Sequence, residues 1–429
     1  MLGLFVVLAL TQVETPVPGA ARESPAATPE SVQPPPAAPE PTTKADPPEP
    51  TWWTGDHLTG EWAGARTWLA DHGVTIDLLY AIEVITNIDA MASTDATSVA
   101  GHLDLGISLD FEKLGLWKGG HFYVLVQNGH GTGINAYVGS ATAISNIEAP
   151  PYTQLTEFFF EQTFFDEKLR IRLGKQDANR DFGTPRFGGN FLNNNFGMFP
   201  STPLPSYPTT GLGAAVIAQP LWWLALKAVF YEGSPRINSF GFDSALAPNA
   251  GWMAIGGVAV THRYGDAGRN GGISSAGFFG QSGQIPEQVP ADQPMRTFRS
   301  NLGFFVQHDQ RLYAHPENAD DPSGLTFISR LCWSQPDRNQ IPLYVGASVA
   351  WHGLGARSDD TVGVGFGWFT LPVQLNGTPG PGSELFVEVF YKWRLTHFLS
   401  LQPDLEYYRH PGGDGPDAVL VGARLKLKL

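Results

Sequence analysis

The chain has 429 residues, of which 16% are charged, with 49 glycines, 35 prolines and a formal net charge of −14 at pH 7. The low charge and the many Gly, Pro and aromatic residues favour β structure with frequent turns. The acidic balance argues against a nucleic-acid partner, because a phosphate-binding surface is basic. The single cysteine, Cys332, excludes an intrachain disulfide and a Cys-rich zinc site.

The N-terminal residues are predicted to lie outside the main folded body. Residues 1–20 contain a short apolar core that resembles a secretory signal peptide, although no Lys or Arg precedes it. Residues 21–51 are rich in Pro, Ala, Glu and Thr and are expected to form an extended tether. Residues 52–73 form the next segment, in which 65–72 have the pattern of a short amphipathic helix that ends at Gly73.

After Gly73 the hydrophobic period changes from helical to alternating, and it stays alternating to residue 429. No apolar run is long enough for a transmembrane helix. We expect about sixteen strands, with no helices between them. The predicted strands are 74–88, 101–112, 120–128, 155–165, 168–177, 211–219, 222–232, 251–264, 273–280, 298–308, 324–335, 341–352, 361–371, 384–394, 398–409 and 417–429.

The connections between these strands tend to alternate in length. Long, Gly/Pro/Asn-rich connections include 129–154, 178–210 and 233–250, whereas tight turns occur at Asp166-Glu167 and Gln219-Pro220. Short turns on one rim and long loops on the other are typical of an outer-membrane barrel. The alternative is a soluble β-sandwich, which shows the same alternation. The number and length of the strands, the low charge and aromatic residues at strand ends such as Trp222-Trp223 favour an all-β, antiparallel transmembrane barrel of residues 74–429.

The hairpin at 155–177 shows the two faces of such a barrel. A turn at Asp166-Glu167 would place Thr163 opposite Arg170 and Glu161 opposite Arg172. One face would then be apolar and the other would carry acids and bases. In a barrel the charged face lines the pore, whereas on a soluble sheet it would be an ordinary cross-strand ion pair.

The last segment, DAVLVGARLKLKL, has the same alternation. We expect it to close the barrel by pairing with the first strand, which removes the open edges of the sheet. Arg424 would then face the pore, and Lys426 and Lys428 would lie near the periplasmic rim.

Several blocks of the chain resemble the OprB family of carbohydrate-selective porins. They include LTGEWAGARTWLADHGV, FFDEKLRIRLGKQDANRDF, NFLNNNFGMFPSTPLPSYPTTGLGAAV and LSLQPDLEYYRHPGGDGPDAVLVGARLKL, and they occur in the family's order from about Leu58 onward. The resemblance implies a sixteen-stranded barrel in the bacterial outer membrane that lets sugars diffuse inward, often as a homotrimer. A departure from the family is Leu429, where an aromatic residue is common.

We therefore expect a passive channel for mono- and small oligosaccharides, with outer-membrane lipid as its surroundings and no enzymatic activity, cofactor or metal. The loop at 178–210 is the best candidate for a constriction, because its asparagines offer donors and acceptors without charge. The predicted pore-lining or solute-contacting residues are Glu157, Glu161, Arg170, Arg172, Asp177, Asn179, Arg180 and Asp181. Two alternatives stay open: a general or cation-preferring porin, and a secreted β-rich carbohydrate-active or sugar-binding protein.

Overall fold

The computed structural model describes most of the chain after Trp53. The described residues are 53, 55–90, 96–185, 190–245, 247, 250–265, 270–290, 293–314, 323–375 and 380–429. The predicted signal peptide and tether lie outside them. No helix in these ranges is long and apolar enough to cross a membrane.

The described chain forms sixteen strands, five of them preceded by short helices. The elements, in chain order, are η1 (Trp62–Gly64), α1 (Ala65–Asp71), β1 (Val74–Ala90), β2 (Thr97–Asp110), β3 (Gly120–Gly131), α2 (Asn135–Val138), β4 (Tyr152–Phe164), β5 (Leu169–Gln176), α3 (Asn179–Phe182), η2 (Asn194–Phe196), β6 (Gly211–Leu221), β7 (Leu224–Glu232), α4 (Phe242–Ala245), β8 (Trp252–Tyr264), β9 (Asn270–Pro286), β10 (Thr297–Ala314), β11 (Gly324–Ser334), β12 (Leu343–Leu354), β13 (Arg357–Leu371), β14 (Gly382–Arg394), β15 (Leu399–Arg409), η4 (Pro411–Gly413) and β16 (Ala418–Lys428).

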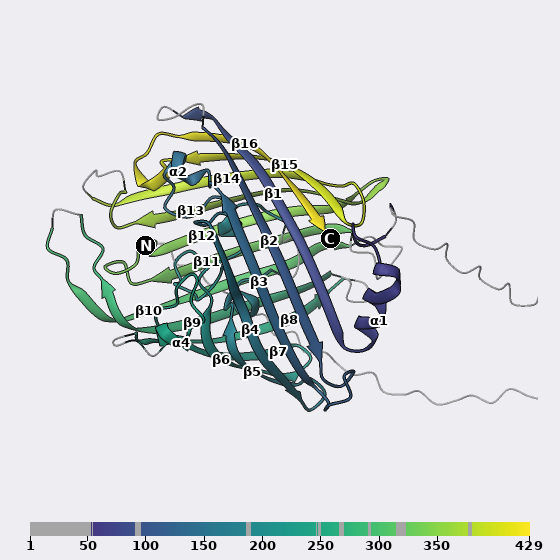
Figure 1. Cartoon of the computed structure of the whole chain (residues 1–429). Helices are drawn as coiled ribbons and strands as arrows, with labels where there is room; N and C mark the ends of the chain where they lie inside the picture. The colour runs from purple at the N-terminus through teal and green to yellow at the C-terminus, as the bar shows by residue number, and fades with distance from the viewer. Residues whose placement is uncertain are drawn as a thin grey trace, which may run out of the picture. The chain divides into compact units, whose positions relative to one another are not determined.

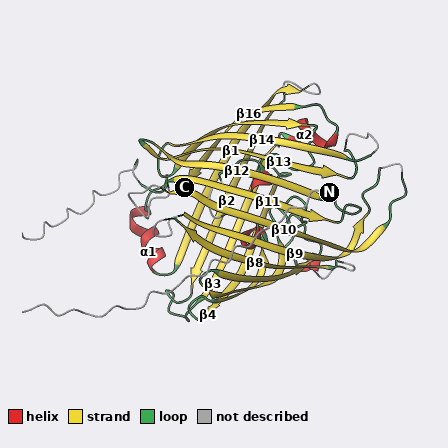
Figure 2. Ribbon diagram, turned by 180° about the vertical axis from the view of Figure 1, so that it is seen from behind, coloured by secondary structure: helices red, strands yellow, loops and turns green. Residues whose placement is uncertain are grey.

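The strands form one closed barrel in which each pairs antiparallel with its neighbours in sequence. The barrel closes where β16 pairs with β1, with Arg424 opposite Glu83. Both views place α1 and the C-terminus at one rim and α2 at the other (Figures 1 and 2). The predicted sixteen-stranded barrel and its closing pair are confirmed.

The barrel is apolar outside and polar inside, the arrangement of a transmembrane barrel. On the outer face, Phe278 is 70% exposed and Leu302 is 55% exposed. On the inner face, Arg172 and Glu388 are buried. The alternation along each strand produces this separation, because successive side chains point to opposite faces of a sheet.

Two predictions at strand ends need correction. Strand β9 is longer than expected because its Gly/Ser/Gln-rich ends pair through the main chain although they lack an apolar alternation. Strand β10 is longer because residues 309–314 continue its pairing with β11. The neighbouring aromatics at strand ends also do not all face outward. Tyr407 is exposed, but its neighbour Tyr408 is fully buried, since the next residue in a strand faces the interior.

At the rim with α1, the segment before β1 contacts the last residues of the chain. The Arg66 side chain donates to the carbonyl oxygens of Ile76 (3.2 Å) and Leu429 (3.1 Å). Leu58 N–H donates to the Lys428 carbonyl at 2.9 Å. Gly73, which follows α1, has a φ of 85°, a left-handed conformation that suits glycine after a helix. These contacts attach the helical segment to the seam of the barrel.

Candidate functional site: the barrel interior

The hairpin of β4 and β5 has the predicted register, with Thr163 opposite Arg170 and Glu161 opposite Arg172. Arg172 is the centre of its charged face. The Arg172 guanidinium lies 2.8 Å from a Glu161 carboxylate oxygen and 2.8 Å from an Asp181 carboxylate oxygen. Arg170 lies 3.7 Å from Glu161, and its side chain is 38% exposed, whereas that of Arg172 is 4% exposed. Arg172 therefore joins the barrel wall to the connection after β5.

A second group of contacts holds the start of that connection. Arg180 donates to Glu157 at 2.6 Å, and the Asp177 N–H donates to the other Glu157 oxygen at 3.0 Å. The Asp177 carboxylate accepts the Asn179 N–H at 2.7 Å. Burial, and then the charge of Glu157, raise the pKa of Asp177 to about 6. The eight predicted residues thus lie in two adjoining clusters at one wall.

The connection of residues 177–210, named here loop 3, crosses the interior of the barrel. On β11, Arg330 donates to the carbonyl oxygens of Met198 (2.9 Å) and Gly183 (2.6 Å). On β14, Glu388 accepts the N–H groups of Leu192 (2.7 Å) and Asn193 (3.0 Å). Since β5, β11 and β14 are well separated around the barrel, loop 3 reaches several walls and narrows the space between them.

A second loop takes part in this constriction, and sequence reasoning missed it. Residues 132–151, named here loop 2, pair with loop 3 through an antiparallel bridge between Ser145 and Asn193. The Asn146 N–H donates to the Leu192 carbonyl at 2.8 Å. Arg424 on β16 donates to the Asn146 amide oxygen (2.8 Å) and the Ser145 hydroxyl (2.8 Å). A signal existed in the apolar residues of loop 2, because Ile134 and Ile144 would be unfavourable on an exposed loop and both are buried in the structure.

The wall of β14–β16 was also missing from the predicted site, apart from Arg424, which was expected to face the pore. Glu388 faces Glu406 directly across the β14–β15 pair, and Asp404 lies on the same face two residues from Glu406. Glu406 accepts hydrogen bonds from the side chains of Asn193 (2.7 Å) and Tyr408 (2.8 Å). These positions belong to the polar face of their strands, but alternation does not tell which polar residues meet a loop.

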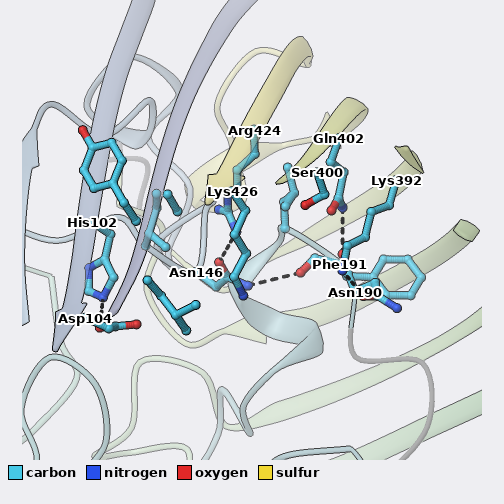
Figure 3. A pocket seen from close by; sticks show the side chains of 15 residues that line it. His102, Asp104, Asn146, Asn190, Phe191, Lys392, Ser400, Gln402, Arg424 and Lys426 are labelled. Atoms are coloured by element: carbon cyan, nitrogen blue, oxygen red, sulfur yellow. Dashed lines mark hydrogen bonds and ion pairs between the residues drawn. The ribbon is translucent and has the colours of Figure 1, made fainter. Parts of the chain in front are cut away.

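Three cavities lie along the interior and share lining residues. The loop cavity, of about 310 Å³, is bounded mainly by loop 3. The wall cavity, of about 180 Å³, lies against β1, β2 and β14–β16 (Figure 3). Both are lined by Asn146 and Phe191. The rim cavity, of about 200 Å³, shares Lys392 and Lys426 with the wall cavity and reaches the turn before β15. The three cavities therefore adjoin one another between the loops and the rim with α1.

The interior of the barrel offers polar groups that can bind solutes. Among the described residues, no group of three or more His, Cys, Asp or Glu side chains is placed to hold a metal ion. The loop cavity is lined by amides, hydroxyls and aromatic rings. Such a surface exchanges hydrogen bonds with water or an uncharged polyol.

Comparison with known proteins gives consistent matches. Residues 94–429 match the family described as "Carbohydrate-selective porin, OprB family". The chain is 25% identical over 414 residues to Porin B of Pseudomonas aeruginosa, covering 85% of this chain and 89% of that protein. Its fold is similar to the high-pH structure of Pseudomonas putida OprB, with a TM-score of 0.79, 18% identity, and 88% of this chain and 100% of that chain covered. For the low-pH structure the TM-score is 0.58, with 17% identity and 88% and 99% covered.

Proposed function

The chain belongs to the OprB family of carbohydrate-selective porins, and on that premise we propose that the loop cavity is where its sugars are selected. The protein is a channel of the bacterial outer membrane through which sugars diffuse. Family membership sets aside the alternative of a secreted carbohydrate-active protein. The proposal concerns which residues meet the sugar and what the neighbouring charged residues do.

The observation that carries this proposal is the chemistry of the loop-cavity lining. Its polar side chains are almost all uncharged, and its apolar ones include two aromatic rings. The lining residues are Asn146, Asp177, Asn179, Thr184, Pro185, Phe191, Asn194, Phe196, Gly197, Met198, Ser206 and Tyr207. The one carboxylate, on Asp177, already accepts backbone hydrogen bonds from Asn179 and Tyr207.

This lining matches the surface of a monosaccharide, which has hydroxyls, an apolar ring face and no charge. Amides and hydroxyls can replace part of the water around a sugar, and aromatic rings can contact its apolar face. Each contact is weak, so the sugar can leave as well as enter, which conduction requires. Asn194 suits this role, because its side chain is only partly buried and donates to the weak acceptor Met198 Sδ at 2.9 Å.

The eight residues predicted from the sequence then divide into two roles. Asp177 and Asn179 line the loop cavity, and we assign them to solute contact. The other six form the charged network of this wall: Glu157, Glu161, Arg170, Arg172, Arg180 and Asp181. All but Arg170 act as positioning groups, because their ion pairs hold loop 3 against the wall, whereas Arg170 contacts only Glu161 on the neighbouring strand.

Replacement of Asn194 tests the proposal. In Asn194→Leu, a side chain of similar size loses its amide, and we expect glucose-driven swelling of proteoliposomes to slow by about threefold to tenfold, the cost of about one hydrogen bond. Swelling with an amino acid of similar size should change less. Asn194→Gln is the matched control and should recover most of the glucose rate.

Equal swelling rates for glucose and the amino acid in the wild-type protein would contradict sugar selection and favour a general or cation-preferring porin. Assembly as a homotrimer is a secondary part of the proposal, supported by the family resemblance alone. Sedimentation of the detergent-extracted protein tests it.

A further inference from the structure

The wall cavity carries a regular array of basic groups on three neighbouring strands. Arg424 on β16 lies opposite Gln402 on β15, and the β14–β15 register places Lys392 on the other side of Gln402. In the next row toward the rim, Lys426 lies opposite Ser400, which lies opposite Arg394. The rows are two residues apart, so all six side chains share the inner face. Two neutral polar groups thus lie between four cationic ones, of which Arg424, Lys392 and Lys426 line the wall cavity and Arg394 lines the rim cavity.

Acidic side chains compensate only part of this charge. Arg424 forms a buried ion pair with Glu83 at 2.6 Å. Lys392, by contrast, donates to the neutral amide oxygen of Asn190 at 2.8 Å. Within the described ranges, neither Lys392 nor Lys426 has a carboxylate within ion-pair distance.

Asp104 is the one carboxylate among the described residues that line the wall cavity. Its oxygen accepts hydrogen bonds from His102 (2.8 Å) and Gln127 (2.7 Å). Among the described residues, the three cationic side chains that line the cavity, Arg424, Lys392 and Lys426, face two carboxylates, Glu83 and Asp104. The formal charge of this group is therefore one positive charge in excess. The whole chain has a net charge of −14, so this local excess is opposite in sign to the protein around it.

The position and size of the cavity suit a small solute. Figure 3 shows Lys392, Gln402, Ser400, Lys426 and Arg424 converging on one space. Its volume of about 180 Å³ is more than ten times the roughly 15 Å³ that one water needs. It shares lining residues with both the loop cavity and the rim cavity, so it lies beside the constriction on the side of the rim with α1.

We propose that the wall cavity binds the carboxylate of a sugar acid, so that the channel accepts monovalent aldonates or uronates as well as neutral sugars. The two ammonium groups meet the carboxylate, and Gln402, Ser400 and Asn146 meet the hydroxyls. A single uncompensated charge matches one carboxylate. This inference rests on the proposed function, since the anion must first pass the loop cavity.

The test is competition for labelled glucose flux into proteoliposomes, at constant ionic strength. The probes are gluconate and glucitol, which differ in having a carboxylate or an alcohol at one end. For the wild-type protein we expect gluconate to inhibit at a concentration at least about tenfold lower than glucitol. In Lys392→Gln/Lys426→Gln the ratio of the two inhibitory concentrations should fall to about one. The ratio does not depend on the total flux.

Lys168→Gln is the matched control, because Lys168 is an exposed lysine in the turn between β4 and β5, on the same rim but outside the cavity. It should keep the wild-type ratio. If the double variant does not fold into a heat-modifiable barrel, the single variant Lys426→Gln replaces it in the same competition test. A wild-type ratio near one, a ratio unchanged in the double variant, or equal inhibition by chloride or phosphate would each overturn the inference. Absence of glucose flux in the wild-type protein would instead contradict the proposed function.

Discussion

Two walls of the barrel use charge in different ways. On the wall of β4 and β5, acids and bases are matched: Arg172 contacts Glu161 and Asp181, and Arg180 contacts Glu157. On the wall of β14–β16, charges are separated along the pore axis. Glu388 and Glu406 meet the loops, whereas Lys392 and Lys426 line the space beyond. The paired charges of the β4–β5 wall hold loop 3 in place. The separated charges of the β14–β16 wall produce an electric field that acts on a solute in the pore.

The largest expected effect comes from breaking the matched wall at Arg172. In Arg172→Met, the Asp181 carboxylate stays buried without its ion-pair partner, and Glu161 keeps only the longer contact with Arg170 at 3.7 Å. Removal of one partner of a buried ion pair typically costs about 3–5 kcal/mol. We expect a lower temperature for the heat-modifiable shift in gel mobility and, because loop 3 loses an anchor, a larger single-channel conductance.

Arg170→Met provides the control for this change. Arg170 is partly exposed and lies 3.7 Å from Glu161, so its loss should cost less than about 1 kcal/mol. Equal effects of the two substitutions would show that the buried network of Arg172 does not anchor the loop.

An intermediate effect is expected on the other wall at Glu388. Glu388→Ala removes the acceptor of the Leu192 and Asn193 N–H groups, and buried donors without a partner cost about 1–3 kcal/mol. Loop 3 would then detach from β14 while its contacts at β5 stay intact. Noisier single-channel currents, with a melting temperature that falls less than in Arg172→Met, would sharpen the contrast between the walls, and an unchanged current trace would contradict it.

The smallest effect is a pH dependence at Asp177, next to the matched wall. Its pKa is raised to about 6 from 3.8, so the folded protein holds this proton more tightly than the unfolded chain. The stabilisation from the neutral carboxyl is complete below about pH 4 and is lost as the pH rises through about 6. The side chain in Asp177→Asn does not titrate. The melting temperature of this variant, relative to that of the wild type, should therefore rise as the pH increases from about 4 to about 6. Parallel curves for the two proteins would contradict the raised pKa.

Much of the fold could be predicted from the sequence because its causes are local. The alternation of apolar and polar residues set the strands, and the Asp166-Glu167 turn set the register that pairs Glu161 with Arg172. The charged residues of the β4–β5 wall could be predicted as site residues because their partners are close in the sequence. Asp181, for example, lies only nine residues beyond Arg172.

The rest of the interior depends on contacts that leave no local pattern. Glu388 binds the Leu192 N–H across 196 positions of the chain, and Asn193 pairs with a second loop. The asparagines near residue 193 were expected to offer amides to a solute. Asn193 is fully buried and holds the loops to β15 instead, because a loop inside a barrel must satisfy its own polar groups.

The seam between β1 and β16 has a consequence for how the protein acquires its structure. The Glu83–Arg424 pair joins residues 341 positions apart, whereas every other neighbouring pair of strands is consecutive in the chain. Because contacts over long separations cost the most loop-closure entropy, this pairing is expected to form last. Until it forms, β1 and β16 each present a free edge that can pair with a strand of another chain. The seam is thus the step at which folding competes most directly with aggregation.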